Sequence, residues 1–561
     1  MNVARRVAQG CSVLFFSFWA ATAAEAAEPA AVRLVDATDR SGVRFVHTDG
    51  GSGQEYIVEF VVAGLALFDY DGDGLIDIYL LNGAPLKGTV VDTPPRNALY
   101  RNNGDGTFTD VTEQAGVGDL GYGLGVTAAD FNNNGHQDLF VNNFGPNVLY
   151  RNNGDGTFTD ITHQAGTGGG DLVGAGAAFL DIDGNGLLDL YVANYVDFTY
   201  ENNVSGMLSR YRFYAGPQDY RPVPDILYRN NGDGTFTDIS VSSGIAAVAG
   251  AGMGMVSFDH NDNGHTDIFV CNDKGANFLF RNDGTGRFQE VGLIAGLAYD
   301  VTGAANGSMG ADCGDFDNDG LLDLFMTDFQ AEMPVLYRNL GGGFFEDVTR
   351  RAGAGRSAFP HVNWGVGFVD FANDGRRDIF IAHGHLLENI EEIDPRASYR
   401  VPNTLLLNTG DGRFADVSDR SGSGLKVVEC SKGAGFDDLT NDGRIDAVIL
   451  NANSRPTILR NESDTGNRWL QLRLRGVTAS RDGVGAKVTV AAGDLTQVAE
   501  VHSGRGYQSH YGTRLHFGLG RRERVDQVAV RWIGGGTEVF YDLPVNQKLV
   551  LTQGTGAPAA P

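Results

Sequence analysis

Seven short acidic segments of the chain have the residue types and spacing of an oxygen-based cation site. The first reads DYDGDGLID from Asp69, and its relatives carry mostly carboxylate or amide side chains at positions one, three, five and nine. Side chains that alternate within a tight loop point toward one centre, and the glycine at position six permits the sharp turn. Oxygen-only donors favour Ca²⁺ over transition metals, so the segments predict several structural calcium sites.

The seven loops are unequal in the charge that they offer to a cation. The first and fifth carry four aspartates each and are expected to bind most firmly, whereas the sixth has Ala372 at position three and is expected to bind least. A weakly charged loop has the alternative of staying empty, held by its own hydrogen bonds. The expected metal ligands are Asp69, Asp71, Asp73, Asp77, Asp130, Asn132, Asn134, Asp138, Asp181, Asp183, Asn185, Asp189, Asp259, Asn261, Asn263, Asp267, Asp315, Asp317, Asp319, Asp323, Asp370, Asp374, Asp378, Asp438, Thr440, Asp442 and Asp446.

These loops are not EF-hands, although they share part of the EF-hand pattern. An EF-hand needs a bidentate acidic residue at position twelve, and that position, counted from Asp69, is Leu80. β-rich runs such as DLFVNN follow the loops, where an EF-hand would have a helix. Calcium is therefore expected to hold two strands together and not to operate a switch.

The elements that position the loops repeat along the chain with them. Successive first aspartates are 51 to 78 residues apart, and a glycine stands five residues before each one. A second signature, LYRNNGDGTFTDVT from Leu99, returns five times with variations. NGDG is a hairpin turn between the third strand, LYRN, and the fourth strand, FTDVT, because Asn and Gly tolerate the positive φ that such turns require. Each unit is predicted to be four antiparallel strands, so the chain is predicted to be all-β with a seven-bladed β-propeller.

The N-terminal segment supplies what the last repeat lacks. The seventh unit ends at LRN, residues 459–461, whereas VRLVDATDRSG from Val32 resembles the missing fourth strand. We expect this strand to complete the seventh blade of a propeller spanning residues 32–461, which removes two exposed sheet edges. The repeated glycines are expected where seven inner strands converge and leave no room for side chains.

A second, smaller all-β domain is expected over residues 467–553. WLQLRLRG, AKVTVAAG, VAEVHSG and VDQVAVRW alternate apolar and polar residues with a period of two, which predicts a β-sandwich-like domain. GRGYQS lies between two of these runs and opens no helix, so it is only a weak candidate for phosphate binding. The tail, residues 554–561, is expected to be disordered.

These motifs together resemble a known combination of domains. The acidic loops and the LYRNNGDGTFTDVT runs resemble FG-GAP/VCBS repeats, the propeller repeats of integrin α subunits. NRWLQLRLRG, SRDGVGAKVTV, EVHSGRGYQSH, LHFGLG and VDQVAVRW, in order from Asn467 to Trp532, are similar to the ASPIC/UnbV domain of cartilage-acidic-protein-like proteins. The integrin-like resemblance implies that ligands engage the face away from the calcium loops.

Charge and the N-terminal residues bound the partners and the location. The net charge is -27 and no basic run offsets it, which argues against a nucleic-acid partner. The expected ligand positions include 21 aspartates, so seven Ca²⁺ ions would reduce the net charge to about -13. Arg5 and Arg6, the run CSVLFFSFWAATAA and the small residues after it predict a signal peptide over residues 1–26, with a retained anchor as the alternative. We therefore expect a secreted or periplasmic protein without a transmembrane segment after cleavage.

Recognition is expected on the face opposite the acidic loops. The long insertions, residues 83–98, 195–226 and 384–404, all connect second to third strands and share that face, and variable loops on a rigid scaffold usually carry binding. The second insertion is rich in Tyr and Arg, which favours a binding surface, although it could also cover the channel mouth or dock the C-terminal domain.

Several polar residues are candidates for contacts on this face. Polar side chains recur five positions past each last aspartate, and the alternative to ligand contact is the capping of strand ends. His383 and His385 with Glu388 could instead hold a metal, although HGHLLE is short and unspecific. The candidates for ligand contact are Asn82, Asn194, Tyr214, Tyr220, Asp328, His383 and His385.

The function that the sequence favours is binding. No Gly-x-Ser-x-Gly elbow, zinc-protease motif, P-loop or CxxC motif occurs in the chain, and no catalytic residue is assigned. We expect a calcium-binding propeller that binds a protein or glycan. The alternatives are a lyase or isomerase acting on a carbohydrate or natural product in the central depression, and a purely structural component.

Overall fold

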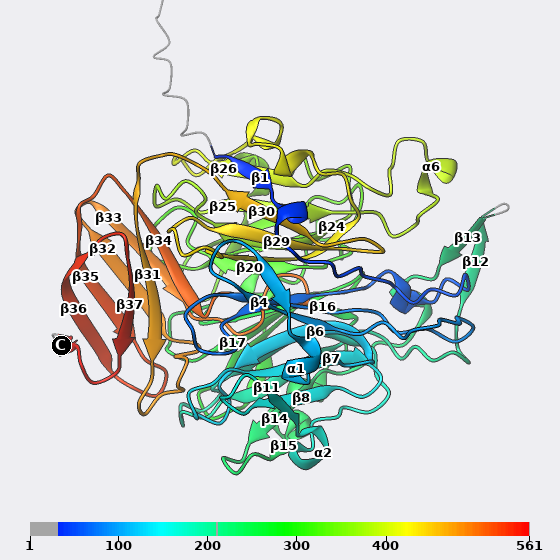
Figure 1. The fold of residues 1–561 in the computed structure, drawn as a ribbon, viewed down its shortest axis with the longest axis horizontal. Coiled ribbons are helices and arrows are strands. Elements are labelled where there is room, and N and C mark those ends of the chain that lie inside the picture. The colour runs from blue at the N-terminus through cyan, green and yellow to red at the C-terminus, as the bar shows by residue number, and fades with distance from the viewer. Residues whose placement is uncertain (1–31, 209–210, 560–561) are drawn as a thin grey trace, which may run out of the picture.

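The computed structural model describes residues 32–208 and 211–559, so the expected signal peptide lies outside the described residues. The described chain is all-β and forms two bodies that lie against each other (Figure 1). The larger body, residues 34–461, contains seven four-stranded antiparallel sheets, and the smaller body follows from Arg468. Within the described residues, no helix has the length and apolar character needed to span a bilayer.

The first two strands of each sheet flank an acidic loop, as the repeat predicts. The first strand ends one residue before the first aspartate of the loop, and the second strand begins at the last aspartate. The first strands are β2 (Leu65–Phe68), β6 (Tyr122–Ala129), β10 (Gly174–Leu180), β16 (Gly252–Phe258), β20 (Ala311–Gly314), β24 (Asn363–Val369) and β28 (Ser431–Asp437). The second strands are β3 (Asp77–Leu80), β7 (Asp138–Phe144), β11 (Asp189–Asn194), β17 (Asp267–Asn272), β21 (Asp323–Met326), β25 (Asp378–His383) and β29 (Asp446–Asn451).

The third and fourth strands form the outer hairpin of each sheet. The third strands are β4 (Ala98–Asn102), β8 (Val148–Asn152), β14 (Ile226–Asn230), β18 (Phe278–Asn282), β22 (Val335–Asn339), β26 (Thr404–Asn408) and β30 (Thr457–Asn461). The fourth strands are β5 (Phe108–Asp110), β9 (Phe158–Asp160), β15 (Phe236–Asp238), β19 (Phe288–Glu290), β23 (Phe345–Asp347), β27 (Phe414–Asp416) and, from the N-terminus, β1 (Leu34–Asp36). β1 pairs antiparallel with β30, which is the pairing that the N-terminal sequence predicts.

The fourth strand is shorter than the FTDVT run suggested. It ends at the aspartate, whose side chain turns the chain: Asp110 Oδ1 accepts bonds from the backbone N–H and the hydroxyl of Thr112 at 3.0 and 2.6 Å. A single helical turn follows in each sheet, α1 (Thr112–Ala115), α2 (Thr162–Ala165), α3 (Ser240–Ser243), α4 (Gly292–Ala295), α5 (Thr349–Ala352), η5 (Ser418–Arg420) and η1 (Thr38–Arg40). The expectation that Val-Thr continues the strand is therefore wrong.

Adjacent sheets are joined by an asparagine at the end of each third strand. The Asn102 amide donates to the Ile76 carbonyl of its own acidic loop at 2.9 Å and to Leu439 of the loop in the neighbouring sheet at 2.7 Å. The same residue of every sheet reaches its neighbour in this way, so the bonds run from sheet to sheet and return to the first. The further pairs are Asn152 with Tyr70, Asn230 with Phe131, Asn282 with Ile182, Asn339 with His260, Asn408 with Phe316 and Asn461 with Phe371.

The first strands pack against one another in the same cyclic order, with β28 against β2. The repeated glycines make this close approach possible. A Cβ on Gly125 would lie 1.9 Å from the carbonyl oxygen of Ala175 in the next sheet, and one on Gly365 would lie 2.6 Å from the carbonyl oxygen of Lys432. The glycines were therefore correctly expected to mark strands that leave no space for a side chain.

The smaller body consists of two sheets that enclose an apolar core, in agreement with the sandwich-like prediction. One sheet orders β34 (Arg514–Gly520), β31 (Arg468–Arg475) and β37 (Gln547–Thr552). The other orders β33 (Leu495–Glu500), β32 (Lys487–Ala492), β35 (Arg524–Arg531), β36 (Thr537–Pro544) and β38 (Ala557–Pro558). The expected disorder of the tail is corrected at β38, because Pro558 and Ala557 pair with Glu538 and Val539 of β36.

The insertions lie on the side of the larger body away from the smaller one (Figure 1). The second insertion contains the hairpin of β12 (Ser205–Leu208) and β13 (Tyr211–Tyr214), and the third contains α6 (Ile390–Ile393). The segment between β1 and β2, residues 37–64, lies with them: Tyr56 packs against Phe198 and Tyr200 of the second insertion. The remaining one-turn helices are η2 (Ile57–Glu59), η3 (Pro217–Asp219), η4 (Ile245–Ala247) and η6 (Gly424–Lys426).

Candidate metal loops, the interdomain plug and the insertion face

Each acidic loop is held in shape by its first and last aspartates. In the first loop, Asp69 accepts backbone N–H bonds from Gly72 and Gly74 at 2.9 and 3.1 Å. Asp77 accepts from the N–H groups of Tyr70 and, across the sheet, Asn102 at 3.0 and 2.8 Å. These backbone hydrogen bonds hold both carboxylates in place independently of a cation.

Three loops bring carboxylates close enough to share a cation. One ligand atom from each of three aspartates lies within 4.8 Å of the others in the first, third and fifth loops. All of these ligand atoms are hard oxygen atoms, so each group fits a divalent cation that prefers oxygen ligands. The three groups are Asp69, Asp71 and Asp77; Asp181, Asp183 and Asp189; and Asp315, Asp317 and Asp323.

The other predicted ligand positions are engaged differently in this structure. Asp73 and Asp319, at position five, accept backbone N–H bonds from Leu75 and Leu321 at 2.8 and 3.0 Å. In the sixth loop Asp374 forms an ion pair with Arg376, and in the seventh Asp442 pairs with Arg444 at 2.6 Å. The predicted ligand sets of these two loops stay predictions.

Without a cation, stability is expected to depend on pH because these aspartates are buried. Burial raises the pKa of Asp189 and Asp315 to about 7 and that of Asp446 to about 8. A carboxyl with a higher pKa in the folded chain binds protons preferentially there. Its contribution to stability is complete below the unfolded pKa near 4 and is lost as the pH rises through the folded value. Melting in excess chelator should therefore occur at lower temperature at about pH 8 than at about pH 5. A melting temperature that rises over this range would contradict the interpretation, and added Ca²⁺ should flatten the dependence.

The smaller body covers the acidic loops, which lie on the face opposite the one where the sequence predicts recognition. Arg473 pairs with Asp69 at 3.1 Å, Arg531 pairs with Asp259 at 2.6 Å, and the Gln471 amide donates to Asp438 at 2.9 Å. The C-terminal domain therefore docks on the acidic loops. The alternative that the second insertion docks this domain is wrong, because that insertion contacts residues 54–60 on the opposite side.

A segment of the smaller body, residues 502–511, enters the larger body and contacts the first strand of all seven sheets. We call it the central plug. Its backbone pairs with β20 through Gly506 and Ala311 and lies parallel to β2 through His510 and Ala66. The Val126 N–H donates to the Gln508 carbonyl, the Ser503 hydroxyl donates to the Ala128 carbonyl, and His502 Nδ1 faces the Ser257 carbonyl. The Tyr511 hydroxyl donates to the Val366 carbonyl, Gly504 lies against Ala177, and Ser509 lies against Gly433.

One buried ion pair fixes the central plug to the larger body. Arg505 Nε donates to Asp312 Oδ1 at 2.6 Å, and a terminal nitrogen of the same guanidinium donates to the Cys313 carbonyl at 3.1 Å. Asp312 is 0% exposed and also accepts the Phe368 N–H at 2.7 Å. The guanidinium lies 4.9 Å from the ring centre of Tyr511, within the range of a cation–π contact.

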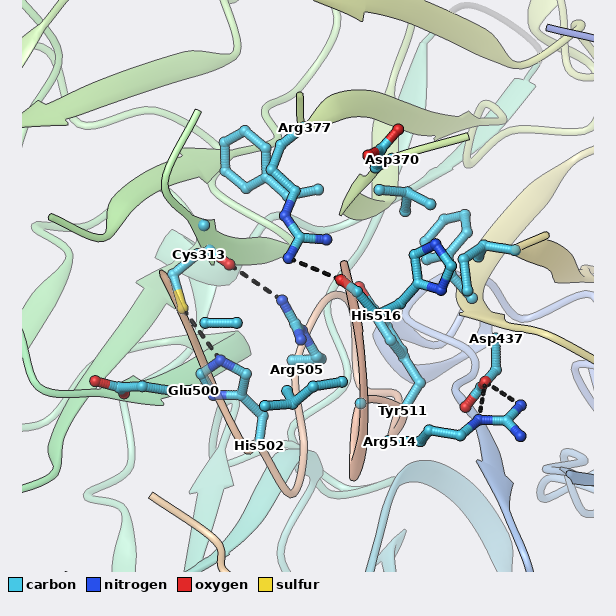
Figure 2. A pocket seen from close by; sticks show the side chains of 18 of the residues that line it. Cys313, Asp370, Arg377, Asp437, Glu500, His502, Arg505, Tyr511, Arg514 and His516 are labelled. Atoms are coloured by element: carbon cyan, nitrogen blue, oxygen red, sulfur yellow. Dashed lines mark hydrogen bonds and ion pairs between the residues drawn. The ribbon is translucent and has the colours of Figure 1, made fainter. Parts of the chain in front are cut away.

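A small cavity of about 70 Å³ remains beside the central plug, and Figure 2 shows the side chains around it. Cys313 Sγ lies 3.5 Å from His502 Nε2, whose other nitrogen faces the Ser257 carbonyl at 2.9 Å. Burial raises the pKa of the Cys313 thiol and lowers that of the His502 imidazole. Both groups are thereby kept neutral, which is unlike the ionised pair of a nucleophilic cysteine. Their contact is that of a thiol facing a ring nitrogen.

The polar residues expected on the insertion face are buried beneath the loops. Asn82 accepts the Thr48 N–H at 2.8 Å and donates to the carbonyls of Val46 and Arg96. Such bonds secure the strand end and the adjoining loops, which is the capping role left open by the sequence. Asn194, Asp328, His383 and Tyr220 are also buried, so ligand contact by these residues stays a prediction.

His383, at the end of β25, and His385, in the third insertion, do not form a metal centre with Glu388. His383 Nε2 lies 2.8 Å from the Thr404 hydroxyl, and His385 Nδ1 accepts the Leu387 N–H at 3.0 Å. Among the residues that the structure describes, only the three aspartate groups bring three such ligand atoms within 4.8 Å. The metal interpretation of HGHLLE is therefore not supported by the geometry.

Comparison with known families agrees with both bodies. FG-GAP-like repeat models match residues 69–141, 130–192, 259–326 and 315–381, and the ASPIC and UnbV model matches residues 476–558. The chain carries FG-GAP-like repeats and an ASPIC/UnbV domain. The matched repeats contain the first six acidic loops, and the matched ASPIC/UnbV residues contain the central plug. The family resemblance expected from the sequence is thereby confirmed.

Named relatives are similar over part of their length. The chain is 25% identical to human cartilage acidic protein 1 over 374 residues, which is 64% of this chain and 50% of that protein. It is 31% identical to the Xenopus tropicalis protein of the same name over 172 residues, 29% of this chain and 25% of that one. The chain thus spans about half the length of the human relative that it matches.

Solved structures show only weak overall similarity. A lectin of Agrocybe aegerita, described with non-reducing terminal N-acetylglucosamine, has a TM-score of 0.36 and 20% identity over 63% of this chain and 79% of its own. The rhamnogalacturonan lyase of Bacillus licheniformis has a TM-score of 0.37 and 13% identity over 72% of each chain. These scores are too low to support an argument about function.

Proposed function

We propose that this protein is a secreted or periplasmic, calcium-binding, closed seven-bladed propeller that binds a protein or glycan through the face bearing its insertions. The acidic loops on the opposite side have a structural role, in which Ca²⁺ neutralises clustered carboxylates. The ASPIC/UnbV domain covers these loops and fills the centre of the propeller with its plug.

Three features support a closed, calcium-bearing propeller. The first strands contact in cyclic order, and the asparagine bonds link every acidic loop to the next and return to the first. The N-terminal strand β1 joins the same sheet as β28 to β30, so both ends of the repeat array lie in one blade. The oxygen-only groups of the first, third and fifth loops fit the ligand preference of Ca²⁺.

The observation that carries the binding face is the position of the ASPIC/UnbV domain. Arg473, Arg531 and the plug occupy the side of the acidic loops, which leaves the insertions on the accessible side. The insertions also differ from one repeat to the next, whereas the loops on the covered side are alike. A rigid scaffold with variable loops on its free face is typical of a binding protein.

Blocking one face at a time tests this proposal. Cys271, Cys313 and Cys430 are buried, so a single exposed cysteine introduced into a Cys11→Ser background can be coupled selectively to a long polyethylene glycol chain. Met207→Cys places the polymer on the β12–β13 hairpin, and Val477→Cys places it on the ASPIC/UnbV domain; both positions are exposed. Binding to a glycan array and to candidate protein partners is measured with Ca²⁺ present.

The proposal predicts that the polymer at Met207→Cys abolishes binding and that the same polymer at Val477→Cys leaves it intact. Each unmodified cysteine variant serves as the control for its own substitution. Loss of binding only when the ASPIC/UnbV domain carries the polymer would overturn the assignment of the face.

A further inference from the structure

The insertion face contains a strongly acidic pocket, and its acidic residues come from outside the repeat motifs. It has a volume of about 470 Å³, within the range of ligand pockets, and its charged residues come from three distant parts of the chain. Asp49, Glu55 and Glu59 come from the segment between β1 and β2, Arg212 from β13, and Glu388 from the third insertion. Four carboxylates therefore face a single guanidinium.

Glu59 is the deepest of these carboxylates and lacks a full set of partners. It is 5% exposed; its Oε2 accepts the Tyr214 hydroxyl at 3.1 Å, whereas its Oε1 has no hydrogen-bond partner in the described chain. Oε2 of Glu55 is likewise buried without a partner. Burial raises the pKa of Glu59 to about 7. An unpartnered buried carboxyl oxygen is costly, so this pocket lacks a hydrogen-bond donor or positive charge that would satisfy it.

Asn453 holds two of the pocket's carboxylates in place. The Asn453 amide donates to Asp49 Oδ2 at 2.7 Å and to Glu388 Oε1 at 3.1 Å, and its own oxygen accepts the Asp49 N–H at 2.9 Å. Asn453 adopts a φ of 52°, in the left-handed region, to make these bonds. Two carboxylates from different segments are thereby fixed at one side of the cavity.

The spacing of the carboxylates distinguishes an organic cation from a metal ion. A metal centre needs ligand atoms around one point, as in the acidic loops, where three lie within 4.8 Å of one another. The carboxylates of this pocket form no such group among the residues described, and they surround a much larger space. A guanidinium or ammonium group on a flexible stem presents several donors and can satisfy separated carboxylates together.

We propose, on the basis of the binding face assigned above, that this pocket binds the basic side chain of an arginine or lysine presented by a protein partner. The charge also argues for a protein over a neutral glycan, because neutral sugars do not compensate four carboxylates. Arg212 lies at this pocket and contacts Gln54 Oε1 at 3.4 Å, which leaves the carboxylates in excess.

The test uses the full chain with Ca²⁺ and a labelled Gly-Gly-Arg-Gly-Gly peptide, followed by fluorescence anisotropy. The same peptide with citrulline in place of arginine is the neutral probe. The double variant Glu59→Gln, Glu388→Gln should weaken binding of the arginine peptide by about tenfold or more and bring it close to the citrulline peptide. The matched control, Asp92→Asn with Glu392→Gln, removes the same charge from exposed insertion residues outside the pocket and should change the affinity less than about twofold.

Folding does not limit this test, because glutamine keeps the shape of glutamate and removes an uncompensated buried charge; unchanged melting of the double variant checks this. Equal weakening by the control pair, or no weakening by the pocket pair, would overturn the proposal, as would competitive displacement of the peptide by Ca²⁺ from this pocket. If a protein partner is blocked by the polymer at Met207→Cys but binds the pocket variant normally, only the pocket proposal fails. If binding of the peptide requires the pocket carboxylates but the polymer at Met207→Cys blocks no protein partner, only the assignment of the binding face fails.

Discussion

Excess chelator is expected to lower the melting temperature of this protein by on the order of 10 °C, because at least three loops hold clustered carboxylates. In the first loop, Asp69, Asp71 and Asp77 lie within ligand distance of one another, and the Arg473 ion pair with Asp69 offsets only part of their repulsion once Ca²⁺ is removed. The asparagine bonds connect each loop to the next sheet, so loosening of a loop reaches the contact between sheets. Scanning calorimetry with and without chelator measures the effect.

Matched variants separate metal binding from general charge. Asp71→Asn, Asp183→Asn and Asp317→Asn together should remove much of the chelator effect. Asp105→Asn changes an exposed aspartate that bonds to Thr107 in the neighbouring NGDG turn, and it should leave the chelator effect unchanged. Ca²⁺ should restore the melting temperature at a lower concentration than Mg²⁺ does, since Ca²⁺ tolerates irregular oxygen coordination. An unchanged melting temperature in excess chelator would remove the structural role assigned to the loops.

Arg505→Ala is expected to cost about 3–5 kcal/mol in the free energy of unfolding, because it leaves a fully buried carboxylate without its partner. Asp312 has no solvent access, and Arg505 is its charged partner in the central plug, beside the Tyr511 hydroxyl, which donates to Asp312 Oδ2 at 3.3 Å. The plug should lose its attachment to the first strands as well. Urea unfolding measures the cost, and hydrogen exchange of residues 502–511 shows whether the plug is released.

Two comparisons isolate the buried pair. Arg522→Ala removes an arginine of the same domain whose partner, Asp494, is exposed, and it should cost less than about 1 kcal/mol. The double variant Arg505→Ala, Asp312→Asn should recover part of the stability, because the uncompensated charge is gone. A cost for Arg505→Ala as small as that for Arg522→Ala would show that the plug is not anchored by this pair.

The repeat made most of the larger body predictable from the sequence. Loop spacing, the NGDG turn and the recurring glycines all point to one strand arrangement, and the N-terminal run from Val32 was recognisable as the missing strand because it repeats the FTDVT pattern. The single turn after Asp110 was missed because Val-Thr continues a β-rich pattern, whereas the Asp side chain caps a turn. Local pattern and local hydrogen bonding compete at this point.

The central plug was missed for a different physical reason. GRGYQS has the composition of an exposed loop, and nothing within it shows that Tyr507 and Gly506 will be buried by another domain. Burial here comes from shape and long-range pairing, which a local pattern does not contain. The side on which the ASPIC/UnbV domain docks follows from the same contacts and was equally hidden.

The acidic pocket also lies outside what the repeats could predict. Glu59 and Asp49 stand in the connection between β1 and β2, which matches no repeat, and Glu388 is more than three hundred residues away in sequence. The sequence placed the insertions on one face but contained no signal that would bring these carboxylates together. Tyr214 was singled out there, and its hydroxyl contacts Glu59.

Hydrogen exchange of the protein with a bound partner tests whether the insertion face carries binding, because it reports which face becomes protected. The measurement is made in Ca²⁺ on the full chain, with and without the partner. We expect new protection in residues 49–59, 195–226 and 384–404, with unchanged exchange in the acidic loops and the ASPIC/UnbV domain. New protection confined to the acidic loops or to residues 467–558 would contradict it.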